Sequence, residues 1–173
     1  NTTGNYNSAM GNLALVSNTT GNYNSAMGTQ ALFFNTAGSY NSAMGVYAGQ
    51  SDSGGRDNET SNNSVYLGYD TRALANGDTN EIVIGASAIG IGSNSVVLGN
   101  DSITTTALKG NVGIGTTSPS SKLSVGNGTN GVSDFTVYVD NNDAYGIYSM
   151  GTDEGIHGGG AIGVHGTAWN IGV

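Results

Sequence analysis

The chain has 173 residues, no cysteine, and a formal net charge of −8 from 4 basic and 12 acidic side chains. A nucleic-acid-binding surface needs clustered basic residues, so this balance argues against a nucleic-acid partner. Without cysteine the chain has neither disulfides nor zinc–thiolate sites. Because no apolar run approaches the ~18–20 residues of a membrane span, we also expect no membrane partner in this segment.

Glycine is abundant, with 30 residues against a single proline, while only 9% of residues are charged. The usual share of glycine is only about 7%. This composition is typical of repetitive β structure, in which Gly, Asn, Ser and Thr occupy tight corners between short apolar strands.

Residues 1–51 consist of three near-identical 17-residue repeats, which read NTTGNYNSAMGNLALVS, NTTGNYNSAMGTQALFF and NTAGSYNSAMGVYAGQS. The unit is too short for a helix–turn–helix repeat, which needs more than about 30 residues. Its Gly and Asn content also opposes helix formation. The repeat suits one coil of a parallel β-solenoid, with two short strands, two corners and ~4.8 Å between stacked coils.

Residues 52–115 contain a related but divergent motif. After an irregular stretch at 52–62, it reads NSVYLG at 63–68, NEIVIG at 80–85, NSVVLG at 94–99 and NVGIG at 111–115. The steps from Asn to Asn are 17, 14 and 17 residues. We therefore expect further coils of the same solenoid in this region.

The strand in each coil has two faces that must be assigned. The residue before the motif glycine is always large and apolar, and the residue two positions earlier lies on the same face because strand side chains alternate. We expect this face to be the interior. The expected solenoid core is Met10, Met27, Met44, Val65, Leu67, Ile82, Ile84, Val96, Leu98, Val112 and Ile114.

The intervening strand residues are then expected to point outward. They are Ala9, Ala26, Ala43, Tyr66, Val83 and Val97. Exposed apolar residues need cover, so these positions are candidate contacts between chains. This is the physical reason for expecting an oligomer.

Two further columns recur once per coil in the first three repeats. Tyr6, Tyr23 and Tyr40 are a candidate surface ladder. They would either present a receptor or carbohydrate surface or stack from coil to coil and stabilise the solenoid, and we favour the second. Asn7, Asn24 and Asn41 are expected to form hydrogen-bonded corner ladders.

The C-terminal third has a different pattern. Residues 116–134, which include Pro119, predict a neck or linker with a short strand at 122–125. In residues 135–173, short Gly–Ile/Val–Tyr/His units follow at steps of 9, 8 and 9 residues, from Gly146 to Gly172. Such short units favour a triple-β-helix-like shaft to which three chains each contribute a strand. The chain opens and ends inside repeats, so we expect a piece of a longer polypeptide.

No residue pattern indicates catalysis, a cofactor or a metal. His157 and His165 occupy equivalent repeat positions; a ring of histidines could bind metal, but a tolerated half-buried ring is the favoured interpretation. The acidic groups at 52–59 and 140–143 are interpreted as polar turns rather than calcium sites. The Gly-Ile-Gly pairs at 90–92 and 113–115 precede no helix, so they are not phosphate loops.

The motifs NSVYLG, NEIVIG and NSVVLG resemble the head repeats of trimeric autotransporter adhesins of the YadA-like type. The NTTGNYNSAMG units resemble repeats of phage tail-fibre and bacterial surface-fibre proteins, and GNVGIGTTSPSSKLSV resembles a segment that often ends such arrays. The resemblance covers about residues 1–125. It implies a left-handed parallel β-roll, a parallel homotrimer, an extracellular location on a cell surface or virion, and a role in adhesion or spacing.

We therefore expect an all-β, non-enzymatic segment of a trimeric extracellular fibre that spaces or presents a binding tip. Its expected partners are copies of itself and a host-cell surface or glycan receptor. One alternative is a self-assembling extracellular filament. The other is the stem of a polysaccharide-degrading tailspike.

Overall fold

The computed structural model describes residues 2–119 and 122–125, in two compact units, Asn1–Ala107 and Leu108–Val173. All described strands are short, and no described residue is helical. No helix that could cross a membrane occurs among these residues. The expected shaft at 135–173 and most of the expected linker at 116–134 lie outside the described residues.

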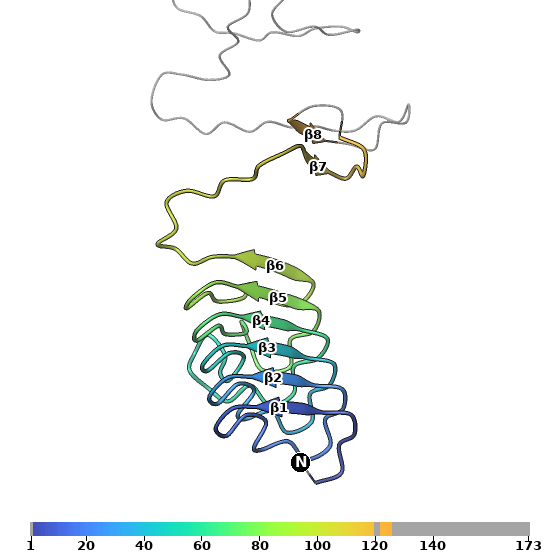
Figure 1. Ribbon diagram of the computed structural model, residues 1–173, viewed down its shortest axis with the longest axis vertical. Helices are drawn as coiled ribbons and strands as arrows, with labels where there is room; N and C mark the ends of the chain where they lie inside the picture. The colour runs from blue at the N-terminus through green and yellow to red at the C-terminus, as the bar shows by residue number, and fades with distance from the viewer. Residues whose placement is uncertain (1, 120–121, 126–173) are drawn as a thin grey trace, which may run out of the picture. The chain divides into compact units, whose positions relative to one another are not determined.

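The first unit is a parallel β-solenoid of about five turns (Figure 1). Its six strands stack in chain order into one sheet. They are β1 (Ser8–Met10), β2 (Ser25–Met27), β3 (Ser42–Met44), β4 (Val65–Leu67), β5 (Glu81–Ile84) and β6 (Ser95–Leu98). Every neighbouring pair is parallel, and equivalent repeat positions face each other, as Ser8 faces Ser25 and Val65 faces Ile82. The prediction of stacked parallel coils is confirmed for this unit.

The predicted assignment of the two strand faces is wrong, because the structure inverts it. Ala26, Ala43, Tyr66 and Val83, which were expected to point outward, are at most 4% exposed. Val97 is half-buried in the last coil, and Ala9 is exposed in the first. The expected core residues instead lie on the outer face, either exposed (Met10, Met27, Met44, Val96, Leu98) or half-buried (Val65, Leu67, Ile82, Ile84).

The physical reason lies in the corner opposite the strand. Leu15 and Leu32 reach into the interior from that corner and are at most 4% exposed. They fill the narrow core of the first coils, so the strand can add only alanine there. Further along the chain Gly49 takes the place of the leucine, and the larger Tyr66 enters from the strand side. The interior of each coil is therefore filled by side chains, although the positions that supply the large side chain change along the solenoid.

Buried amides connect the coils, as the Asn columns predicted. The Asn7 Oδ1 accepts a hydrogen bond from the Asn24 backbone N–H at 2.8 Å, and the Asn24 Oδ1 accepts one from the Asn41 N–H at 2.9 Å. The Asn24 Nδ2 also donates to the Gly38 carbonyl at 2.7 Å. Each amide thus satisfies one donor and one acceptor of the next coil, away from water.

Glycine ends most of the strands for a steric reason. Gly28 has φ +134, and a Cβ built there would lie 2.4 Å from the Gly45 carbonyl oxygen of the next coil. The backbones of successive coils meet too closely at this corner to admit any side chain.

The second unit has two described strands, β7 (Val112–Ile114) and β8 (Leu123–Val125). They pair in parallel, with Val112 opposite Leu123. The short strand expected at 122–125 is confirmed apart from its first residue. Ile114, expected in the core, is exposed, and Val112 is half-buried.

Candidate functional site

The outer face of the six-stranded sheet is the candidate functional site, because it presents two columns of side chains that the described residues leave exposed or half-buried. We call it the outer sheet face. One column is Met10, Met27, Met44, Leu67, Ile84 and Leu98; the other is Ser8, Ser25, Ser42, Val65, Ile82 and Val96.

None of these twelve outward residues is charged. Met10 is 64% exposed, Met44 is 53% exposed and Leu98 is 58% exposed, although all three are apolar. A contiguous apolar surface of this kind marks an interaction site in soluble proteins. The parallel register keeps the columns straight, so equivalent side chains of successive coils lie next to one another on this face.

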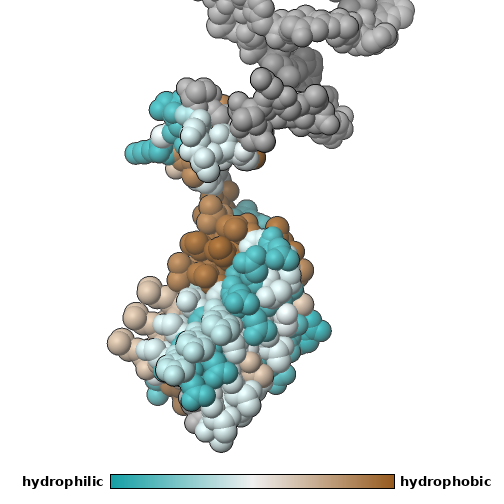
Figure 2. All heavy atoms as spheres, turned by 90° about the vertical axis from the view of Figure 1, so that its right-hand side faces the viewer, coloured by the Kyte–Doolittle hydropathy of each residue, from teal (hydrophilic) through white to brown (hydrophobic). Residues whose placement is uncertain are grey.

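The outer sheet face becomes more apolar along the solenoid. Serine occupies the second column in β1–β3, whereas valine or isoleucine occupies it in β4–β6. Figure 2 agrees: the strongly hydrophobic residues gather toward the β6 end of this unit, and the other end is mostly polar or weakly hydrophobic. The face therefore has a direction.

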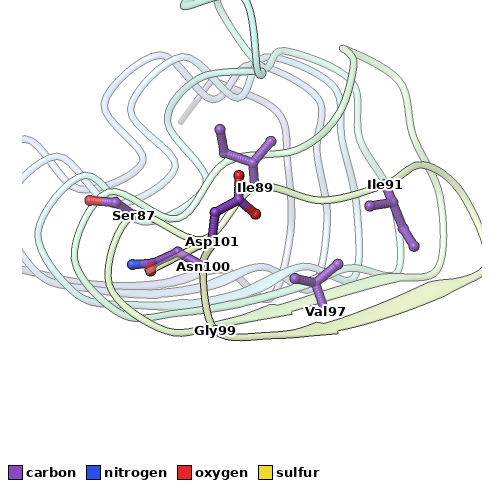
Figure 3. Close-up of a pocket in the computed structure, with 7 residues that line it drawn as sticks. All are labelled: Ser87, Ile89, Ile91, Val97, Gly99, Asn100 and Asp101. Atoms are coloured by element: carbon purple, nitrogen blue, oxygen red, sulfur yellow. The ribbon is translucent and has the colours of Figure 1, made fainter. Parts of the chain in front are cut away.

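At its β6 end the solenoid has a hollow of about 160 Å³. Ile89, Ile91 and Val97 line it from opposite walls of the last coil, together with Asp101 (Figure 3). Among the described residues, no strand pairs with the far edge of β6. Asp101 is the single titratable group of the lining, so the hollow has no acid–base pair for catalysis.

The tyrosine column forms the expected stacked ladder. The ring centroids of Tyr6 and Tyr23 are 4.8 Å apart at an interplanar angle of 13°, and those of Tyr23 and Tyr40 are 5.0 Å apart at 7°. Rings stacked face to face expose mainly their edges, whereas a sugar stacks on an open ring face. The geometry therefore favours a stabilising role over a carbohydrate platform.

All three tyrosines have left-handed backbone conformations, with φ between 56° and 60°. In the later coils Asn63, Asn80 and Asn94 continue the same positive-φ position. Asparagine tolerates this conformation better than most residues, which explains why it begins the motifs at 63, 80 and 94.

The acidic group at 52–59 is partly explained by an ion pair. Asp52 is fully buried, and its Oδ2 accepts hydrogen bonds from the Arg56 guanidinium at 2.8 Å. Its Oδ1 accepts from the backbone N–H of Gly54 at 2.9 Å. Burial alone would raise the pKa of Asp52, but hydrogen bonds from Arg56 and Gly54 outweigh it and hold that pKa below its usual value. The group closes a tight hairpin.

Metal-binding chemistry finds no support in the part of the chain that the structure describes, which has no cluster of three or more His, Cys, Asp or Glu side chains fit to hold an ion. His157, His165 and the acidic residues at 140–143 lie outside the described residues. Gly90 and Gly92 surround a buried glutamate, Glu81, rather than forming an anion site.

Sequence reasoning missed Glu81 and the Asp52–Arg56 pair. Glu81 occupies the position of Asn7, Asn24 and Asn41, one residue before the strand position that faces Ser8, Ser25 and Ser42. Alignment of the later motifs on that asparagine column would have shown that a charged residue occupies a buried position. The Asp52–Arg56 pair lies in the irregular stretch, where no repeat offered a guide.

In comparisons with known proteins, no family model, no curated protein and no solved structure matches this chain.

Proposed function

We propose that this chain is a structural segment of an extracellular fibre, in which copies of the solenoid associate in parallel through the outer sheet face. The observation that carries the proposal is the unbroken, uncharged and largely apolar surface that β1–β6 leave uncovered. Fully burying a large apolar side chain stabilises an assembly by about 1.5–3 kcal/mol. One or two such side chains in every coil make the association strong in sum.

The partner that fits this face best is another copy of the same chain, running in the same direction. In a parallel, in-register arrangement, Val65 and Ile82 meet their own equivalents, and Ser8 meets serine. In an antiparallel arrangement the apolar half of one copy would face the serine half of the other, which would bury hydroxyl groups against apolar side chains. The direction of the face therefore favours parallel association.

The resemblance to surface-fibre repeats supports an assembly of three copies. It also supports a role in spacing or adhesion. A trimer of parallel solenoids is a stiff rod whose length increases with each coil. Such a rod spaces or presents a binding tip, and its partner would be a host-cell surface or glycan receptor. Extracellular exposure on a cell or virion suits a chain without cysteine whose stability comes from repeats and self-association.

The test is the mass of the full 173-residue chain in solution, measured by sedimentation equilibrium. We expect three copies for the natural sequence. Met27→Lys places like charges within the contact and should reduce the mass to one copy at micromolar concentration. Val16→Lys is the matched control, because Val16 is also exposed, at 46% against 43% for Met27, and lies outside the sheet.

Three outcomes decide the proposal. A single-chain mass for the natural sequence would overturn it, and so would equal effects of both lysine variants. A mass that rises without limit with concentration would support the filament alternative instead.

A further inference from the structure

Glu81 interrupts a column of neutral side chains inside the solenoid. The column begins with Asn7, Asn24 and Asn41 and continues with Ser64, whose Oγ accepts a hydrogen bond from the Glu81 backbone N–H at 3.2 Å. Each of the four preceding side chains both accepts and donates: the Asn41 Nδ2 donates to the Ser61 carbonyl, for example, and the Ser64 Oγ donates to the Asn62 carbonyl. An ionised carboxylate can only accept.

The surroundings of Glu81 are closed. The residue is 0% exposed, and its Oε1 accepts a hydrogen bond from the Gly92 N–H at 2.9 Å. Its Oε2 is buried without a hydrogen-bond partner among the described residues. The carboxyl group also lies so close to Gly90 that a Cβ there would overlap it. A buried carboxylate with one oxygen unpartnered is costly unless it is neutral.

The charged groups around Glu81 do not favour its ionised form. Asp78, three residues earlier in the same coil, adds a like charge, and Tyr66 of the preceding coil is neutral at ordinary pH. The two arginines of this unit, Arg56 and Arg72, are paired with Asp52 and Asp70. Burial, with a contribution from Asp78, raises the pKa of Glu81. The Gly92 N–H, which donates to Oε1, opposes this rise, and so does the Leu74 N–H, which lies near the carboxyl group without completing a hydrogen bond to it.

We propose that Glu81 is a pH-sensitive element of the solenoid: it is buried as the neutral acid, and its ionisation loosens the coils that carry β5 and β6. The neutral acid carries no charge, like the amides of the asparagine column. Ionisation leaves a charge in a closed interior, on a carboxylate with one unpartnered oxygen. This inference concerns the order of the coils in each chain, and it goes beyond the proposed self-association.

The sign of the effect follows from proton linkage. The pKa of Glu81 is higher in the folded chain than the ordinary value of 4.5, so the folded state binds more protons than the unfolded state between those two values. The contribution of Glu81 to stability is therefore complete in acid. It decreases as the pH rises from 4.5 through the folded-state pKa, and it stays lost above that value.

Hydrogen exchange of the full chain, read by mass spectrometry, tests this directly. After correction for intrinsic rates, we expect peptides covering β5 and β6 to lose at least tenfold in protection relative to those covering β2 and β3 as the pH rises across this range. In Glu81→Gln, which keeps the shape and supplies a permanent donor, this relative loss should disappear. Glu59→Gln is the control, since it removes a carboxylate from a partly exposed position and should keep the natural pH profile.

The proposal is overturned if Glu81→Gln and the natural chain share the same pH profile. A second measurement does not depend on how the variant folds: ¹³C NMR titration of the Glu81 carboxyl in the natural chain. A midpoint above that of the urea-unfolded chain supports the inference, and a midpoint at or below it rejects the inference. Hydrogen exchange reports on the order of the coils and the titration on the protonation of one side chain, so neither readout is the mass of the assembly, and the two separate this inference from the oligomeric state.

Discussion

Gly49 and Tyr66 share one space in the core of the solenoid. A Cβ built on Gly49 would lie 2.6 Å from the Cδ2 of Tyr66 and 2.9 Å from a methyl carbon of Leu32. The missing side chain at one corner is therefore the condition for the aromatic ring in the next coil, where Tyr66 is fully buried.

This relationship predicts a large cost for Gly49→Ala. The added methyl group would overpack the Tyr66 ring, and φ at this position is +64. Overpacking costs about 1–3 kcal/mol and the left-handed conformation adds about 1 kcal/mol, so we expect a loss of about 2–4 kcal/mol in the free energy of unfolding. Urea denaturation followed by circular dichroism measures it.

Gly55→Ala supplies the reference for this change. Gly55 has a similar φ of +73, but a Cβ there would meet nothing within 4 Å. Its substitution should cost only the conformational part, about 1 kcal/mol. Equal losses for the two variants would contradict the shared-space interpretation.

The asparagine column predicts a second asymmetry. Asn24→Ala would leave the Asn41 N–H buried without a partner, whereas the Gly38 carbonyl would keep the hydrogen bond that it accepts from the Asn35 Nδ2 at 3.0 Å. An unsatisfied buried group costs about 1–3 kcal/mol, so we expect a loss of about 1–3 kcal/mol in urea denaturation. Asn22→Ala removes a comparable bond to the Asn5 N–H at the surface, where water can replace it, and should cost less than about 1 kcal/mol.

Asp52 predicts a pH dependence opposite in sign to that of Glu81. Its pKa is lower in the folded chain than the ordinary value of 3.8, so its contribution to stability is present above 3.8 and is lost as the pH falls through the folded-state pKa. Asp52→Asn should therefore lower the free energy of unfolding at pH 7, and the difference from the natural chain should shrink in acid.

Urea denaturation between pH 7 and pH 2 measures this difference. Asp57→Asn is the comparison, since Asp57 is an exposed carboxylate at the end of the same hairpin. A gap between Asp52→Asn and the natural chain that stays constant down to pH 2 would show that the carboxylate charge plays no part.

The sequence predicted the parallel stack well, because a 17-residue spacing with glycine and asparagine at fixed places leaves few alternatives to a coil. It also predicted the asparagine and tyrosine columns, since a repeated residue in a stacked repeat must meet its own copy. These features depend only on the period.

The side of the strand that faces inward could not be predicted from the period. Both faces of Val65–Leu67 and Glu81–Ile84 carry apolar residues, so alternation alone gives no direction. Leu15 and Leu32 determine which face points inward, because they occupy the interior from the opposite corner and leave room only for Ala26 and Ala43. That competition for volume is set by tertiary packing.

The near identity of the first coils has a consequence for how such a chain can change. Repeats 1–17 and 18–34 share the stretch NTTGNYNSAMG, and the junction between them uses the same hydrogen bonds as the junction between 18–34 and 35–51. An in-frame duplication or deletion of one repeat would therefore create no new kind of contact within the shared stretch. Recombination between the matching coding stretches offers a lineage a simple route to solenoids with different numbers of coils.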